Sequence, residues 1–185
     1  MAAWDFDDTL ATTKSNVIFN KGGETKVVSA EDFASQGADL IAEGWVPDFS
    51  EFNKVTGGKP GPMFDNAMKR AKKYGTEDTF ILTARSPDSA VAIKEFLDAL
   101  GLNIPIENIT GLANSTGEAK AMWLLDKHAQ GYNDIAFADD ALQNVDAVRK
   151  VFDEFDIKGK VEQAKAKFSQ DVEATFVEQM LVEGQ

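Results

Sequence analysis

Acidic side chains are concentrated at the start of the chain. The segment WDFDDTL at 4–10 places Asp5, Asp7 and Asp8 within four positions, directly before Thr9. Two carboxylates about 4 Å apart repel each other by roughly 4 kcal/mol at an effective dielectric near 20. Such a group is stable only with protons or a cation beside it. Because the ligands are all oxygen, the ion that fits is Mg²⁺, which binds one or two carboxylates together with phosphate oxygens.

Further polar residues follow later apolar segments. They are Thr83, Ala84 and Arg85 at the end of TFILT, Lys120 early in a predicted helix, and Asp139, Asp140 and Asn144 after DIAFA. In a parallel sheet the carboxyl ends of the strands meet at one edge, where ligands bind. We therefore expect these residues to converge with the N-terminal acids. Lys120 and the Thr83 hydroxyl would there bind a tetrahedral anion.

The elements that must position these residues alternate along the chain. Strands are predicted at the N-terminus and at 79–83, 107–112 and 134–138, and helices at 62–74, 86–101, 117–130 and 141–154. Strand and helix in alternation predict an α/β fold, with a parallel sheet and right-handed crossovers.

An insertion at about 14–76 separates the first strand from the second. Segments 17–19 and 25–29 flank NKGGE, whose Gly22 and Gly23 suit a tight hairpin turn. A helix is predicted at 31–43, and the Gly- and Pro-rich segment 46–62 is predicted as a loop.

A long helical pattern covers 160–182. Its apolar stripe contains Val161, Ala164, Phe168, Val172, Phe176 and Met180. We therefore expect one domain at 1–156 and an amphipathic helix within 157–185. That helix would pack on the domain or bind a partner, including a second copy of the chain.

Composition excludes several classes of chemistry. The 185 residues suit one domain and include no cysteine and one histidine, His128. Thiol catalysis and cysteine zinc sites are thus excluded, and the single histidine disfavours a serine–histidine triad. The net charge of −12 disfavours broad attraction to nucleic acid. No apolar run is long enough to span a membrane and no leader precedes Asp5, so we expect an intracellular protein, in a host cytoplasm or a virion if phage-encoded.

The motifs D-F-D-D-T-L, T, K and D-D-x-x-x-N, in that order over residues 5–144, resemble the haloacid dehalogenase (HAD) superfamily. The resemblance implies a three-layer α/β/α Rossmann-like core, here with a minimal cap formed by the insertion. It implies that Asp5 attacks phosphorus and forms an aspartyl-phosphate, and that Asp7 is the acid and base. Thr83 and Lys120 would be the remaining catalytic residues.

The resemblance also implies the binding residues. Mg²⁺ would be held by Asp5, Asp7 (through its backbone carbonyl), Asp139 and Asp140, with Asp140 the more direct ligand. Phosphate would be bound by Thr9, Thr83, Ala84, Arg85 and Lys120. Lys94 on the preceding helix is the rival to Lys120 as the phosphate-binding lysine.

The expected activity is hydrolysis of phosphate monoesters, because an acid two residues after the nucleophile is typical of the phosphatases of this superfamily. The basic segment MKRAKKYG at 68–75 favours nucleotides or nucleic-acid ends as substrates, although a solvated helix face has the same pattern. A looser likeness links the chain to phage-encoded phosphatase domains and to the phosphatase half of polynucleotide kinases. The alternative is a virion-associated module of this fold with a structural role and little turnover.

Overall fold

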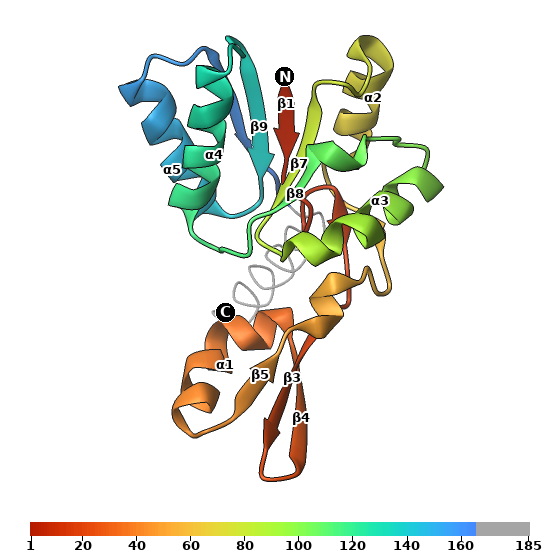
Figure 1. Ribbon diagram of the computed structural model, residues 1–185, viewed down its shortest axis with the longest axis vertical. Helices are drawn as coiled ribbons and strands as arrows, with labels where there is room; N and C mark the ends of the chain where they lie inside the picture. Colours follow the sequence, from red (N-terminus) through yellow and green to blue (C-terminus); the bar gives the residue numbers. More distant parts are fainter. Residues whose placement is uncertain (166–185) are drawn as a thin grey trace, which may run out of the picture.

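A five-stranded parallel sheet forms the centre of the computed structural model, which describes residues 1–165 (Figure 1). Its strands are β1 (Ala2–Trp4), β7 (Thr79–Thr83), β8 (Ile109–Gly111), β9 (Ile135–Asp139) and β10 (Gly159–Gln163). Their order is β10-β9-β1-β7-β8, and every neighbouring pair is parallel. The predicted α/β class is confirmed.

Helices cover both faces of this sheet. Helices α2 (Phe64–Tyr74) and α3 (Ala90–Ala99) lie on one face, and α4 (Gly117–Ala129) and α5 (Leu142–Glu154) on the other. The fold is therefore a three-layer, Rossmann-like α/β/α arrangement. No helix among residues 1–165 is long and apolar enough to cross a membrane.

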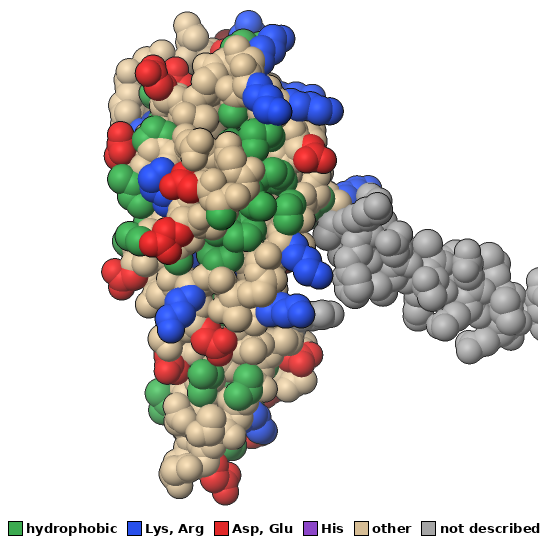
Figure 2. Space-filling model, turned by 90° about the vertical axis from the view of Figure 1, so that its right-hand side faces the viewer, with side chains coloured by type: hydrophobic (Ala, Val, Ile, Leu, Met, Phe, Trp, Pro, Cys, Tyr) green, Lys and Arg blue, Asp and Glu red, His purple; other side chains and the backbone are tan. Residues whose placement is uncertain are grey.

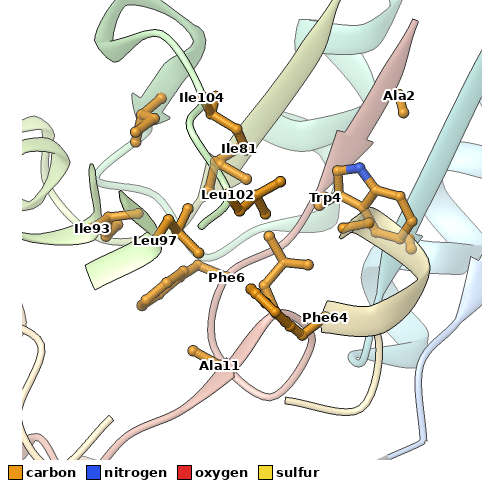
Figure 3. Packing of buried hydrophobic residues seen from close by; sticks show 14 residues of the cluster. Ala2, Trp4, Phe6, Ala11, Phe64, Ile81, Ile93, Leu97, Leu102 and Ile104 are labelled. Carbon is orange, nitrogen blue, oxygen red and sulfur yellow. The ribbon is translucent and has the colours of Figure 1, made fainter. Parts of the chain in front are cut away.

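Alternating side chains of the strands fill two cores. Ile81 packs with α2 and α3, whereas its neighbours Phe80 and Leu82 pack with α4 and α5. Figure 3 shows Trp4, Phe64 and Ile81 within the first of these cores. Each such side chain contributes about 1.5–3 kcal/mol when fully buried.

The short strand β1 is the middle strand of the sheet even though two of its three residues are alanines, which are poor strand formers. Pairing on both sides outweighs that propensity, since Trp4 lies opposite Ile81 of β7 and Ala138 of β9. The next residue, Asp5, continues the ladder by donating its N–H to the Ala138 carbonyl at 2.9 Å. The first acid is thereby fixed at the carboxyl edge of the sheet.

The insertion forms a small body below the carboxyl ends of the strands (Figure 1). Its antiparallel sheet contains β3 (Asn16–Lys21), β4 (Glu24–Ser29) and β5 (Val46–Asp48), followed by the 3₁₀ turn η1 (Ser50–Asn53). The predicted hairpin and helix are confirmed, with α1 spanning Ala30–Ala42. Ser29 caps α1, because its side chain accepts a hydrogen bond from the Asp32 N–H.

Two short strands replace part of the loop predicted at 46–62. One is β5, and the other is β6 (Lys59–Pro60). Strand β6 pairs with β2 (Ala11–Thr12). Both β5 and β6 contain proline, which is tolerated only at the edge of a sheet, and both are edge strands. The prediction of a loop was wrong there because proline was taken as a sign of a loop.

The part of the insertion that stands apart from the central sheet is shorter than the predicted 14–76. It comprises β3 to η1, residues 16–53. Helix α2 belongs to the core, where Phe64 and Ala67 are buried against the sheet. Because α2 leads into β7 through four residues, its basic second half lies toward the amino end of the sheet. Figure 2 shows Lys and Arg side chains gathered at this upper end, away from the insertion.

The helix predicted at 160–182 is wrong over its first residues, because 159–163 form β10. The spacing of Val161 and Ala164 fits a helix, but a long-range contact decides otherwise. A side chain at Gly159 would place its Cβ 1.9 Å from the Ile135 carbonyl oxygen, so glycine alone permits this approach to β9. The sheet thus extends beyond the domain boundary predicted at 156. The rest of the predicted helix, 166–182, and its expected partner contacts lie outside the described residues.

Candidate functional site

A cavity of about 980 Å³ lies between the carboxyl edge of the sheet and the insertion. The residues predicted from the sequence that line it are Asp5, Asp7, Thr83, Ala84, Arg85, Lys120, Asp139, Asp140 and Asn144. They come from four separate segments of the chain. The structure therefore brings together most of the predicted site.

Lys120 lies between two carboxylates at the base of this cavity. Its Nζ donates to Asp5 Oδ1 at 2.7 Å and to Asp139 Oδ2 at 2.6 Å. The Lys120 side chain is only 2% exposed, so these two charge-assisted bonds are poorly screened by solvent. The rival Lys94 is far from this group of charges, since it donates to Asp98 and to the Ile104 carbonyl.

The start of helix α4 determines where Lys120 points. Thr116 caps the helix by accepting a hydrogen bond from the Ala119 N–H. Gly117 follows, and a Cβ there would lie 2.6 Å from the Gln143 carbonyl oxygen of α5. The missing side chain lets α4 and α5 approach closely at their N-terminal ends. Lys120, one turn into α4, can then reach the end of β9.

Asp139 is fully buried, and both of its carboxylate oxygens are bonded. Oδ1 accepts from the Ala141 N–H at 2.9 Å, and Oδ2 accepts from Asn144 Nδ2 at 3.0 Å as well as from Lys120. Asp140, by contrast, is only partly buried, and its carboxylate accepts a long contact of 3.5 Å from the Thr9 hydroxyl. Asp139 is therefore placed to hold Lys120, whereas Asp140 keeps oxygen atoms available for a ligand.

A metal ion could bind at this group of acids. Carboxylate oxygens of Asp5, Asp139 and Asp140 lie within 4.8 Å of one another. Three carboxylates against the one ammonium group of Lys120 leave two negative charges uncompensated, which suits a divalent cation. The Oδ1 atom of Asn144 beside them is buried and has no hydrogen-bond partner among the described residues. An all-oxygen donor set of this kind fits a hard cation.

The same arrangement shifts the pKa values of the acids. Burial raises the pKa of Asp5 well above its usual value, opposed by Lys120 and reinforced by Asp139 and Asp140. Burial also raises the pKa of Asp140, and the charge of Asp139 adds to that shift. For Lys120, burial alone would lower the pKa, but the carboxylates of Asp5 and Asp139 outweigh it and raise the pKa. The acids thus favour a bound proton or a cation beside them.

Arg85 holds the carboxylate of Asp7. Its Nε donates to Asp7 Oδ2 at 2.8 Å, and its Nη2 donates to Asp7 Oδ1 at 2.6 Å and to Thr13 Oγ1 at 3.2 Å. Its Nη1 donates to the carbonyls of Phe52 and Lys54 at 2.9 and 2.7 Å. All five N–H groups of the guanidinium are thus used within the protein. The predicted role of Arg85 in binding phosphate is therefore wrong for this arrangement.

Arg85 instead joins the insertion to the core. The guanidinium lies between the rings of Phe6 and Phe52, at 5.5 and 5.3 Å from their centroids. A second link is close by, where Ser86 Oγ donates to Asn53 Oδ1 at 2.8 Å. Asp7 consequently belongs to the junction of the insertion and the sheet, and its carboxylate is not part of the group that could hold a metal.

Thr9 does not line the cavity, contrary to its predicted role in binding phosphate. Its side chain is fully buried and donates to Asp5 Oδ2 at 3.0 Å, so it orients that carboxylate. Thr83 is buried at the cavity base and accepts a hydrogen bond from the Arg85 N–H. Ala84 is exposed at the cavity and offers its backbone only.

Sequence reasoning missed Asp8 and the insertion side of the cavity. Asp8 has a left-handed backbone, with φ of 60°, and lines the cavity. Partial burial and the charges of Asp140 and Asp7 raise the pKa of Asp8 to about 6. Its place in the acidic segment was a usable signal. Phe49 and Phe52 also line the cavity. No pattern in the sequence around them indicates that they belong to a site.

A scan of the chain against protein-family models gives no match, and neither do searches of curated proteins and of solved structures.

Proposed function

We propose that the protein is a Mg²⁺-dependent phosphatase of the HAD type that hydrolyses phosphate monoesters through an aspartyl-phosphate on Asp5. The observation that carries this proposal is the setting of Asp5. Its carboxylate is fixed by Lys120 at 2.7 Å and by Thr9 at 3.0 Å, within a group of acids that could hold a cation and at the base of a large cavity. Fixed geometry of this kind gives a weak nucleophile its effectiveness.

Two chemical steps follow from this arrangement. In the first, an Asp5 oxygen attacks phosphorus, the bond from phosphorus to the ester oxygen breaks, and Asp7 gives that oxygen a proton. In the second, Asp7 takes a proton from water, whose oxygen attacks phosphorus and releases inorganic phosphate and Asp5. Both Asp7 carboxylate oxygens are bonded to Arg85. Proton transfer by Asp7 therefore requires at least one of these bonds to break.

The remaining residues balance charge. Asp5 and Asp140, with the backbone carbonyl of Asp7, would hold Mg²⁺, which would offset the negative charge of the phosphoryl group. Lys120 carries a positive charge beside the attacking oxygen, and Asp139 keeps Lys120 in place through a bond of 2.6 Å. Asp139 is thus a positioning residue in this proposal.

The test is release of phosphate from p-nitrophenyl phosphate, with Mg²⁺ and with EDTA. Turnover should require the metal and should vanish in Asp5→Asn. The matched control is Asp146→Asn, which removes an exposed carboxylate of α5 and should keep full activity. Absence of phosphate release from folded wild-type protein that binds Mg²⁺ would overturn the proposal and favour a non-catalytic module of this fold.

A further inference from the structure

The cavity has two chemically different sides. The carboxyl edge of the sheet contributes acids, whereas the insertion contributes Val17, Phe33, Phe49 and Phe52. Phe33 contacts Phe49 edge to face, with ring centroids 5.4 Å apart, and stacks on Phe19 of β3 at 6.0 Å. The aromatic side is therefore anchored in the small core of the insertion. Phe49 is nevertheless 48% exposed, so part of an aromatic ring is available at the cavity.

Charge at the cavity excludes ligands with several phosphates. Among the described residues, six carboxylates line it: Asp5, Asp7, Asp8, Asp88, Asp139 and Asp140. The cations among the described lining residues are Arg85 and Lys120, and both already donate to carboxylates. A second phosphate or a nucleic-acid backbone would find no unpaired cation among the described residues that line the cavity. The basic half of α2 does not compensate, because none of its residues lines the cavity.

Neutral polar groups complete the lining. Ser50 lies on the insertion side, beside Phe49, and Asn114 and Ser115 follow β8 on the sheet side. Such groups bind the hydroxyls and ring heteroatoms of an uncharged ligand by hydrogen bonds. The volume of about 980 Å³ is at the upper end of the range that small-molecule sites occupy. The cavity therefore accommodates more than a phosphate group.

We propose that the cavity binds a monoester in which a single phosphate carries a neutral, planar aromatic group, as in a nucleoside monophosphate or an aryl phosphate. This inference rests on the proposed function for the position of the phosphate, which would lie at Asp5. The aromatic group would then stack on Phe49 on the opposite side. Phe49 is thus a specificity-determining residue, and polynucleotide ends are excluded as substrates.

Binding to the Asp5→Asn variant tests the inference without turnover. Isothermal calorimetry with Mg²⁺ should give a dissociation constant for adenosine 5′-monophosphate about tenfold below that for ribose 5-phosphate, since stacking of a base on an aromatic side chain commonly has about this effect. Adding Phe49→Ala should remove the difference by weakening only the aromatic ligand. Phe155→Ala is the matched control, because Phe155 is 52% exposed at the end of α5 and does not line the cavity.

The following results decide whether the aromatic side of the cavity binds the ligand. Equal affinity for the two phosphates, or an effect of Phe49→Ala no larger than that of Phe155→Ala, would overturn the inference. If Phe49→Ala does not fold, Phe49→Leu keeps an apolar side chain and should still weaken the aromatic ligand. Tighter binding of adenosine 3′,5′-bisphosphate than of the monophosphate would refute the charge argument. The binding of naphthyl phosphate to Phe49→Ala then separates two preferences. A loss of affinity indicates a general preference for aromatic groups, and no loss indicates a preference for nucleosides.

The outcome for the proposed function is separate. Turnover of glycerol phosphate and p-nitrophenyl phosphate with Mg²⁺ tests catalysis in wild-type protein, whereas calorimetry tests the aromatic side. Activity without an aromatic preference would refute only the present inference. An aromatic preference in binding without any turnover would refute only the proposed function.

Discussion

Replacing Lys120 by methionine removes the positive charge between two buried acids. Lys120 Nζ lies 2.7 Å from Asp5 and 2.6 Å from Asp139, and its side chain is 2% exposed. Removing one partner of a buried ion pair costs about 3–5 kcal/mol, because the other charge stays buried without compensation. Here two carboxylates lose the same partner. In metal-free protein we therefore expect a loss of about 3–5 kcal/mol in the free energy of unfolding at pH 7.

Thermal unfolding followed by circular dichroism in EDTA measures this loss. In a domain of this size about 1 kcal/mol corresponds to 2–4 °C, so Tm should fall by about 6–20 °C. Lys94→Met is the matched control, because Lys94 also pairs with an aspartate but its side chain is 31% exposed. An exposed pair contributes at most about 1 kcal/mol, and Tm should then fall by no more than about 4 °C.

The pH dependence gives a second check on the Lys120→Met variant. Because the pKa of Lys120 is raised in the folded protein, Lys120 itself keeps its proton from pH 5 to 8, and any change of the loss over this range comes from the acids beside it. Without Lys120 the pKa of Asp5 should rise further, so the folded variant binds protons more readily than its unfolded chain. The loss of stability should consequently be smaller at pH 5 than at pH 8. A loss no larger than that of Lys94→Met, or one that does not shrink on acidification, would refute the reasoning.

Three further predictions follow from other parts of the structure. Burial raises the pKa of Asp5 and Asp140, so metal-free protein should lose stability as the pH rises through their shifted pKa values. Mg²⁺ should therefore raise Tm more at pH 8 than at pH 5. If Mg²⁺ raised the Tm of Asp140→Asn as much as that of wild type, a metal site at Asp140 would be contradicted. Arg85→Lys cannot keep five hydrogen bonds and should cost at least about 2 kcal/mol in urea unfolding. Arg85→Lys should also slow hydrolysis of alkyl phosphates more than that of p-nitrophenyl phosphate, because the p-nitrophenolate leaving group needs no proton. Equal slowing of both substrates would argue against a link between Arg85 and the proton transfer by Asp7. Gly159→Ala places a Cβ 1.9 Å from a carbonyl oxygen of β9 and should lower the free energy of urea unfolding by about 1–3 kcal/mol. Unchanged stability would contradict the close pairing of β10 with β9.

The sequence was sufficient to predict the edge of the sheet where the acids meet. The apolar segments TFILT and DIAFA form strands with clear ends. Asp139 and Asp140 could be predicted as site residues because ligands bind beyond the carboxyl ends of parallel strands. Lys120 was placed by the resemblance to the HAD superfamily, whose lysine precedes the last strand. The predictions at the strand ends succeeded because they depend on local patterns and on one general property of parallel sheets.

The predictions that failed depend on long-range contacts with the backbone. Arg85 was predicted to bind phosphate, but two of its acceptors are the backbone carbonyls of Phe52 and Lys54, which no side-chain pattern in the sequence indicates. The strand β10 depends on the approach of Gly159 to the Ile135 carbonyl. Such contacts between distant segments do not appear in any periodicity of the sequence.

Trapping the phosphorylated protein tests the central claim most directly. With p-nitrophenyl phosphate the first step needs no proton from Asp7, but the second step needs Asp7 to activate water. The Asp7→Asn variant should therefore accumulate the intermediate. Acid quenching and mass spectrometry should show one phosphoryl group on the peptide that contains Asp5, and hydroxylamine should remove it. Release of p-nitrophenol without a phosphoryl group on Asp5 at any quenching time would contradict the account.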